Sequence, residues 1–193
     1  MKKNILLILG HPSENSFCNA LLNAYQRGAE SAGANCKVLY ISRLKFDVNL
    51  AEGYKTGEYM EDDLLAAQEM FTWANHVVFV YPNWWGFMPA ITKGFIDRLF
   101  LPGFAFKHQS GKIFPEKLLK GKSMRLMVTM DTPKWWFYLI YRASQYQILK
   151  DIVFGYVGFD PIRFSTFGFI RKSTDQKREK WLKQVNQLGK ELK

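Results

Sequence analysis

Short apolar runs alternate along this chain with segments of helical periodicity, and this alternation restricts the fold more than any other feature. Three of the runs, at residues 4–9, 76–81 and 123–129, are predominantly apolar, as expected of strands buried on both faces. Parallel strands need long crossovers, which are usually helical. The pattern therefore predicts an α/β fold with an open parallel sheet and helices on both faces.

Five strands and five helices account for most of the chain. The two remaining predicted strands are residues 36–41 and 161–167. The predicted helices span residues 17–32, 61–74, 88–100, 143–154 and 174–192. Residues 103–115 are expected to form a loop or a small hairpin. Because no repeat, low-complexity tract or flexible linker interrupts this order, residues 1–193 are predicted to form a single domain.

The composition is that of an ordinary globular protein. Apolar residues make up 48% of the chain and charged residues 23%, which is too apolar for a disordered chain. No apolar run approaches the roughly 20 residues that cross a bilayer, and the N-terminus does not resemble a signal peptide. Cys18 and Cys36 are too few for a disulfide framework. These features predict a cytoplasmic location.

The charge balance is strongly basic. The chain has 27 Lys plus Arg against 17 Asp plus Glu, and a net charge of +10. Such a surface attracts nucleic acid, anionic lipid or phosphorylated small molecules. A solvated basic face without a ligand is the alternative. Zinc-finger spacing, a recognition helix and RNA-binding signatures are not found in the sequence, so nucleic acid is not expected as a partner.

The loop after the first predicted strand has the composition of a phosphate site. Residues 10–16 (GHPSENS) contain His11 and several hydroxyl groups, but match neither a Walker loop nor a GxGxxG fingerprint. Ser16 is a predicted N-cap, and the free amide groups at a helix start bind phosphate well. The alternative is a capping serine beside an incidental surface histidine.

Two further loops are rich in aromatic residues, although turns usually carry small polar ones. Residues 82–87 (PNWWGF) and 130–138 (MDTPKWWFY) follow the third and fourth predicted strands. Ligands of open α/β sheets bind beyond the carboxyl ends of the strands. The two loops therefore predict a slot for a flat, phosphate-bearing ring system such as a flavin, which Gly86 allows the backbone to approach closely. The alternative is that these rings belong to the core or to an interface.

The same residues resemble a known family, the flavodoxin-like NAD(P)H:quinone oxidoreductases. The resemblance is carried by Gly10-His11-Pro12, Ser16-Phe17, the stretch 82–86, and further matches at Pro89, Lys93-Gly94, Asp97-Arg98 and residues 102–106. It implies a flavodoxin-like five-stranded sheet in the order 2-1-3-4-5. It also implies two-electron reduction of a quinone by NADPH or NADH through a bound flavin, FAD or alternatively FMN, in a homodimer.

The resemblance also implies which residues contact the flavin. These candidate contacts lie in the first two loops and are His11, Ser16, Phe17, Pro82, Asn83, Trp84, Trp85 and Gly86. Asp131 and Thr132, in the loop after the fourth predicted strand, are added to them. The sequence shows no metal cluster, nucleophile or carboxylate pair, which agrees with a reaction carried by a cofactor.

The loop after the fourth predicted strand departs from the family's pattern. The family usually has Thr-Thr-Gly-Gly there, followed by a tyrosine and later a histidine, whereas this chain has 129-TMDTP-133 and no histidine beyond His108. Tyr138 is the candidate for the catalytic tyrosine. Trp135 and Trp136 are expected to narrow the substrate pocket.

Two other functions remain open from the sequence. One is a flavodoxin-like electron carrier, although a charge of +10 suits a phosphorylated nicotinamide better. The other is an ancillary regulatory subunit of a membrane transport system, which residues 135–141 (WWFYLIY) could place at most peripherally on a lipid surface. The enzyme is favoured over both.

Overall fold

The computed structural model describes residues 2–51, 53 and 60–192. Five parallel strands form the central sheet in the order β2-β1-β3-β6-β7. They are β1 (Asn4–Leu9), β2 (Asn35–Tyr40), β3 (His76–Pro82), β6 (Ser123–Thr129) and β7 (Ile162–Phe167). Numbered among themselves, these strands have the order 2-1-3-4-5, so the predicted flavodoxin-like sheet is confirmed.

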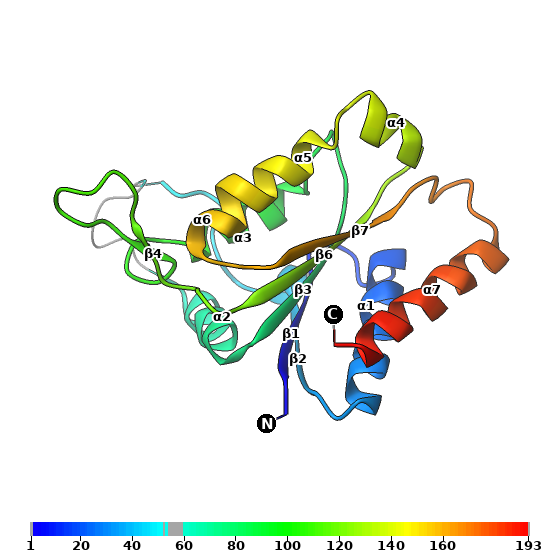
Figure 1. Ribbon diagram of the computed structural model, residues 1–193, viewed down its shortest axis with the longest axis horizontal. Coiled ribbons are helices and arrows are strands. Elements are labelled where there is room, and N and C mark those ends of the chain that lie inside the picture. Colours follow the sequence, from blue (N-terminus) through cyan, green and yellow to red (C-terminus); the bar gives the residue numbers. More distant parts are fainter. Residues whose placement is uncertain (1, 52, 54–59, 193) are drawn as a thin grey trace.

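Helices cover both faces of the sheet (Figure 1). One face carries α1 (Phe17–Ser31) and α7 (Asp175–Lys190). The other carries α2 (Asp62–Trp73), α3 (Ala90–Leu99) and a composite helix made of α5 (Ser144–Gln147), η2 (Ile148–Phe154) and α6 (Gly155–Val157). Successive side chains of a strand point to opposite faces, so Ile5 and Leu7 join one apolar core while Leu6 and Ile8 join the other.

Glycines allow α1 and α7 to pack at close range. A Cβ atom at Gly28 would collide with the carbonyl oxygen of Asn186, and one at Gly189 would collide with that of Tyr25. Trp181 and Val185 are buried on the inner face of α7, as the amphipathic pattern of residues 174–192 predicts. The last helix is therefore fixed to the first by backbone contact as well as by apolar burial.

The region between β6 and β7 differs most from the sequence prediction. The aromatic run was predicted as a loop, but part of it forms α4 (Lys134–Leu139). The helix predicted over residues 143–154 continues to Val157, and its η2 segment is a π-helix. Aromatic content hides the helical period of α4, and a π-turn has more residues per turn than the 3.6-residue pattern that predicts a helix.

Three short elements complete the described chain. A 3₁₀ turn, η1 (Ile41–Arg43), follows β2. Strands β4 (Phe106–Lys107) and β5 (Glu116–Lys117) pair antiparallel, which confirms the small hairpin expected near residues 103–115. Among the described residues, no helix combines the length and hydropathy that would let it span a bilayer.

Candidate functional site

The loops after β1, β3 and β6 meet at the carboxyl edge of the sheet. The Gly10 amide donates to the Val80 carbonyl (2.8 Å), and the Asn83 amide donates to the Thr129 carbonyl (2.7 Å). The Thr92 hydroxyl, on α3, donates to the Gly10 carbonyl (2.8 Å). These bonds hold the first two loops in a fixed position relative to each other and to the sheet.

Two neighbouring cavities lie at this edge and share Asn83 and Asp131. The first, of about 200 Å³, is lined by His11, Ser16, Phe17, Cys18, Pro82, Asn83, Trp84, Thr129, Met130, Asp131 and Ile170. The second, of about 520 Å³, is lined by Asn83, Trp85, Gly86, Asp131, Thr132, Phe137, Tyr141, Ser144 and Gln145. All the predicted cofactor contacts therefore line one cavity or the other, while their role as contacts stays a prediction.

The first loop presents a neutral histidine beside a helix start. The His11 Nδ1 atom accepts a hydrogen bond from the Ser13 amide (2.9 Å), so the ring proton lies on Nε2, where it can be donated. Burial lowers the pKa of His11. Ser16 caps α1 as predicted, since its side chain accepts from the Asn19 amide. This arrangement offers neutral donors to a phosphate.

The tryptophan turn is tight and open to solvent. The Trp84 and Phe87 amides donate to each other's carbonyl oxygens at 2.8 and 3.0 Å, and the two residues between them have positive φ, 54° at Trp85 and 81° at Gly86. Trp84 is 45% exposed and Trp85 is fully exposed. Trp84 and Trp85 therefore do not belong to the core, whereas the alternative that they lie in an interface stays open.

The second cavity contains backbone amide groups that are free to donate hydrogen bonds to a ligand. Among the described residues, the amides of Trp85, Gly86 and Thr132 donate to no protein acceptor. All three residues line the second cavity, together with the aromatic side chains of Phe137 and Tyr141. Unpaired amides beside aromatic rings fit the hydrogen-bonding edge and the apolar faces of an isoalloxazine, so the residues present are suited to a flavin.

Gln145 is a polar residue of the site that sequence reasoning missed. It is almost completely buried, accepts a hydrogen bond from the Asn83 side chain (3.2 Å) and donates one to the Tyr81 hydroxyl (3.3 Å). It therefore holds the Asn83 amide group in one orientation. The only sequence signal was a glutamine in a predicted helix, and nothing in the pattern pairs it with the turn.

Other predicted residues of the third loop have structural partners. Asp131 accepts a hydrogen bond from the Arg171 amide (2.8 Å) and pairs with the Arg171 side chain (3.3 Å). The Tyr138 hydroxyl lies 2.9 Å from Thr166 Oγ1. Tyr138, Trp135 and Trp136 are not among the residues that line the two cavities. The catalytic assignment of Tyr138 stays a prediction.

Basic residues gather near the end of the first cavity formed by Ile170. Arg178 donates to the Ile170 carbonyl (3.1 Å), and Arg171 adjoins it in the chain. Burial, and secondly the charge of nearby Lys177, lowers the pKa of Lys134. Basic side chains therefore lie next to the part of the first cavity that Phe17 and Ile170 line.

The fold and this edge of the sheet define a class of protein. A family model described as a flavodoxin-like fold matches residues 3–189, and the chain belongs to this family.

Individual relatives narrow the class. An uncharacterized NAD(P)H oxidoreductase of Haemophilus influenzae is 27% identical over 183 residues, covering 91% of this chain and 89% of the relative. Human ribosyldihydronicotinamide dehydrogenase [quinone] is 28% identical over 148 residues, covering 66% of this chain and 63% of the human protein. The solved NAD(P)H:quinone oxidoreductase of Methanothermobacter marburgensis superposes with a TM-score of 0.84 at 21% identity, covering 100% of this chain and 97% of that structure; this likeness concerns the fold.

Proposed function

We propose that this protein is a flavin-dependent oxidoreductase that transfers a hydride from NAD(P)H, by way of the flavin, to a quinone or a similar acceptor. The observation that carries the proposal is the pair of adjoining cavities, with a neutral phosphate-type loop at one end and unpaired amides among aromatic rings at the other. The names of the Haemophilus and human relatives support the same chemistry.

In this proposal the chain binds and orients, while the bound cofactor reacts. A bound flavin supplies the redox step, in which NAD(P)H and one proton become NAD(P)⁺ as a quinone becomes a hydroquinone. His11 and the start of α1 hold the phosphate. The amides of Trp85, Gly86 and Thr132 bind the polar edge of the ring, and Gln145 keeps Asn83 oriented toward it. The aromatic rings around the slot exclude water.

We favour FAD over FMN as the cofactor. FAD has a second phosphate, and the basic residues Lys134, Arg171, Lys177 and Arg178 lie near the end of the first cavity. The test is to release the bound chromophore with heat and identify it by chromatography.

We further propose that two copies form a homodimer in the cytoplasm. Large apolar side chains are exposed on α4 and directly after it, at Trp135, Leu139 and Ile140. Neighbouring exposed apolar side chains of this kind often mark a protein–protein interface. Analytical ultracentrifugation at micromolar concentration should give twice the mass of one chain.

Steady-state kinetics test the activity itself. The purified holoprotein should oxidise NADPH or NADH with a soluble quinone, without any protein partner. Because donor and acceptor use one site in turn, double-reciprocal plots should be parallel. Intersecting lines would contradict the shared site. A flavin-containing protein that oxidises no nicotinamide without a redox partner would instead be an electron carrier.

The proposed contact between Trp84 and the flavin can be tested separately. Trp84→Ala should weaken flavin binding or turnover severalfold, because the ring of Trp84 lines the first cavity and packs against His11, and an aromatic contact contributes on the order of 0.5–1.5 kcal/mol beyond burial. Its melting temperature without flavin should stay close to that of the unchanged protein, since the ring is 45% exposed. Leu65→Ala, on α2 and 46% exposed, is the control and should keep normal flavin affinity. If the Trp84→Ala protein loses stability but keeps normal flavin affinity, the proposed contact between Trp84 and the flavin is contradicted.

A further inference from the structure

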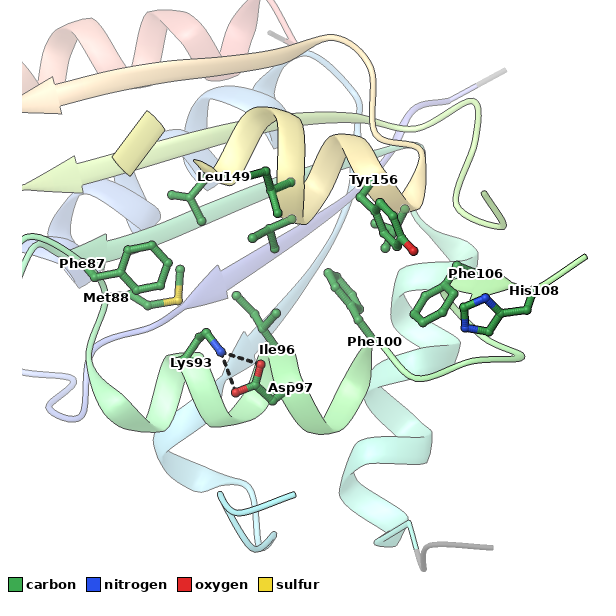
Figure 2. Close-up of a pocket in the computed structure, with 13 residues that line it drawn as sticks. Phe87, Met88, Lys93, Ile96, Asp97, Phe100, Phe106, His108, Leu149 and Tyr156 are labelled. Atoms are coloured by element: carbon green, nitrogen blue, oxygen red, sulfur yellow. Dashed lines mark hydrogen bonds and ion pairs between the residues drawn. The ribbon is translucent and has the colours of Figure 1, made fainter. Parts of the chain in front are cut away.

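A third cavity, of about 450 Å³, lies between α3 and the composite helix of η2 and α6 (Figure 2). Its lining is mostly apolar and consists of Phe87, Met88, Ile96, Phe100, Phe106, Leu149, Ile152, Val153, Tyr156 and Val157, with Lys93, Asp97 and His108 as the charged or polar members. The Lys93 ammonium pairs with the Asp97 carboxylate at 2.6 Å, so these two charges satisfy each other. The interior is suited to hydrocarbon.

The cavity is elongated, and one end adjoins the flavin site. Phe87, Met88 and Leu149 lie at one end, whereas Phe106, His108 and Tyr156 lie at the other (Figure 2). Phe87 directly follows Gly86, which lines the second cavity. Leu149 lies one helical turn beyond Gln145, which also lines the second cavity. If the ring of a molecule lay at the flavin in the second cavity, a chain attached to that ring could therefore pass Gly86 and enter the apolar cavity.

The helix wall of this cavity has an unusual backbone. Leu149, Ile152 and Val153 all belong to the π-helical segment η2, and π-turns are rare and frequently found at functional sites. The Gly155 amide donates to the Lys150 carbonyl, five residues earlier. A Cβ atom at position 155 would collide with that carbonyl oxygen, so the glycine permits the wider turn. The π-helical turns are those that face the cavity.

We propose that this cavity binds the hydrocarbon tail of an amphipathic quinone whose ring is reduced at the flavin site. The inference rests on the proposed function and names its substrate class, a quinone with an alkyl or isoprenoid chain. The volume lies within the range of about 300–1,000 Å³ of small-molecule sites. Transfer of each methylene from water to such a lining favours binding, so affinity increases with chain length.

The test compares two acceptors that share one ring. NAD(P)H oxidation by the holoprotein is followed with 2,3-dimethoxy-5-methyl-1,4-benzoquinone and with its 6-decyl derivative. We expect a KM at least about tenfold lower for the decyl compound, since each buried methylene contributes severalfold, and a similar kcat. Equal KM values would overturn the tail inference while leaving the proposed function in place. Reduction of neither quinone would overturn both.

Variants of η2 locate the tail. Val153→Phe fills the cavity, and Ile152→Lys places a charge in its lining at a position that is already 66% exposed, so the second variant should fold. Both should bring the ratio of the two KM values close to one. The matched control is Ile148→Lys, on the same segment and 41% exposed but outside the lining, which should keep the ratio. A ratio unchanged in Ile152→Lys, or reduced equally in Ile148→Lys, would overturn the inference.

Discussion

At the scale of single residues, Trp85 combines backbone strain with complete exposure. Its φ of 54° lies in the left-handed region, which costs a residue other than glycine or asparagine about 1 kcal/mol or more. An exposed ring contributes no burial that would offset this cost. We infer from this strain the hypothesis that Trp85 has a role in binding, because strained residues cluster at functional sites.

Trp85→Asn tests this explanation. Asparagine tolerates the left-handed conformation, so we expect the flavin-free protein to unfold with a free energy higher by about 1 kcal/mol. Flavin affinity should fall severalfold. Guanidinium unfolding and flavin titration measure the two effects. Leu65→Asn, on α2 and 46% exposed, is the control and should show neither effect. A Trp85→Asn protein that is less stable than the unchanged protein would contradict the presence of strain at this position.

His76 makes the stability of the fold depend on pH. Its ring is completely buried, Nδ1 bonds the Ser123 hydroxyl (2.8 Å), and Nε2 has no partner among the described residues. Burial, followed by the charges of Lys3, Arg125 and Arg163, lowers the pKa of His76 to about 3. The unfolded histidine binds a proton below about pH 6.5, so the folded state loses stability as pH falls from about 6.5 to 3.

Because of the lowered pKa of His76, the free energy of unfolding should be about 2 kcal/mol lower at pH 5 than at pH 7.5, since one pKa unit corresponds to about 1.4 kcal/mol. Denaturant unfolding at the two pH values measures the difference. His76→Asn should remove most of the difference in stability between the two pH values, even if the variant is less stable than the unchanged protein at each pH. His108→Asn, in an exposed loop, should leave it unchanged. A pH dependence that persists in His76→Asn would assign the effect to other groups.

At the scale of secondary-structure elements, the contact of α1 with α7 should respond to a single methyl group. Gly28→Ala favours the isolated helix by about 1 kcal/mol. The new Cβ would nevertheless collide with the Asn186 carbonyl, and overpacking costs about 1–3 kcal/mol. We expect a net loss of stability in thermal or denaturant unfolding. The control is Arg27→Ala, at the exposed neighbouring position, which should change stability by less than about 0.5 kcal/mol. A Gly28→Ala protein that is more stable than the unchanged protein would contradict the prediction, because it would show that α1 and α7 can move apart at no cost.

At the scale of the whole molecule, the net charge of +10 should act on the nicotinamide substrate. NADPH carries a phosphate that NADH lacks, and salt screens its attraction to an exposed basic surface. Raising the salt concentration from about 0.05 to 0.5 M should therefore increase the KM for NADPH severalfold more than that for NADH. Initial rates with one quinone at each salt concentration give the two KM values. If salt raised both KM values equally, the net charge would not act on the additional phosphate of NADPH.

The sequence alone determined the order of the sheet and brought the candidate site to its carboxyl edge. Residues 4–9, 76–81 and 123–129 are apolar enough to predict buried strands, and strands of this kind in alternation with helices allow few topologies. Ser16, His11 and the tryptophan turn could be found because each lies directly after a strand, and parallel strands bring those ends to one edge. The periodicity of buried side chains is a local property, so it can be read along the chain.

Only the tertiary structure decided how the site is completed. Gln145 reaches Asn83 from 62 residues away, and no local pattern encodes that pair. The helix α4 escaped prediction because its aromatic content obscures the 3.6-residue period. The helix over residues 143–154 was predicted, but its sequence did not indicate that the η2 segment has the wider π-helical turn. The apolar cavity exists because α3 and η2 pack face to face while leaving a space between them. Packing between distant elements depends on the shapes of both partners, which a sequence read residue by residue does not contain.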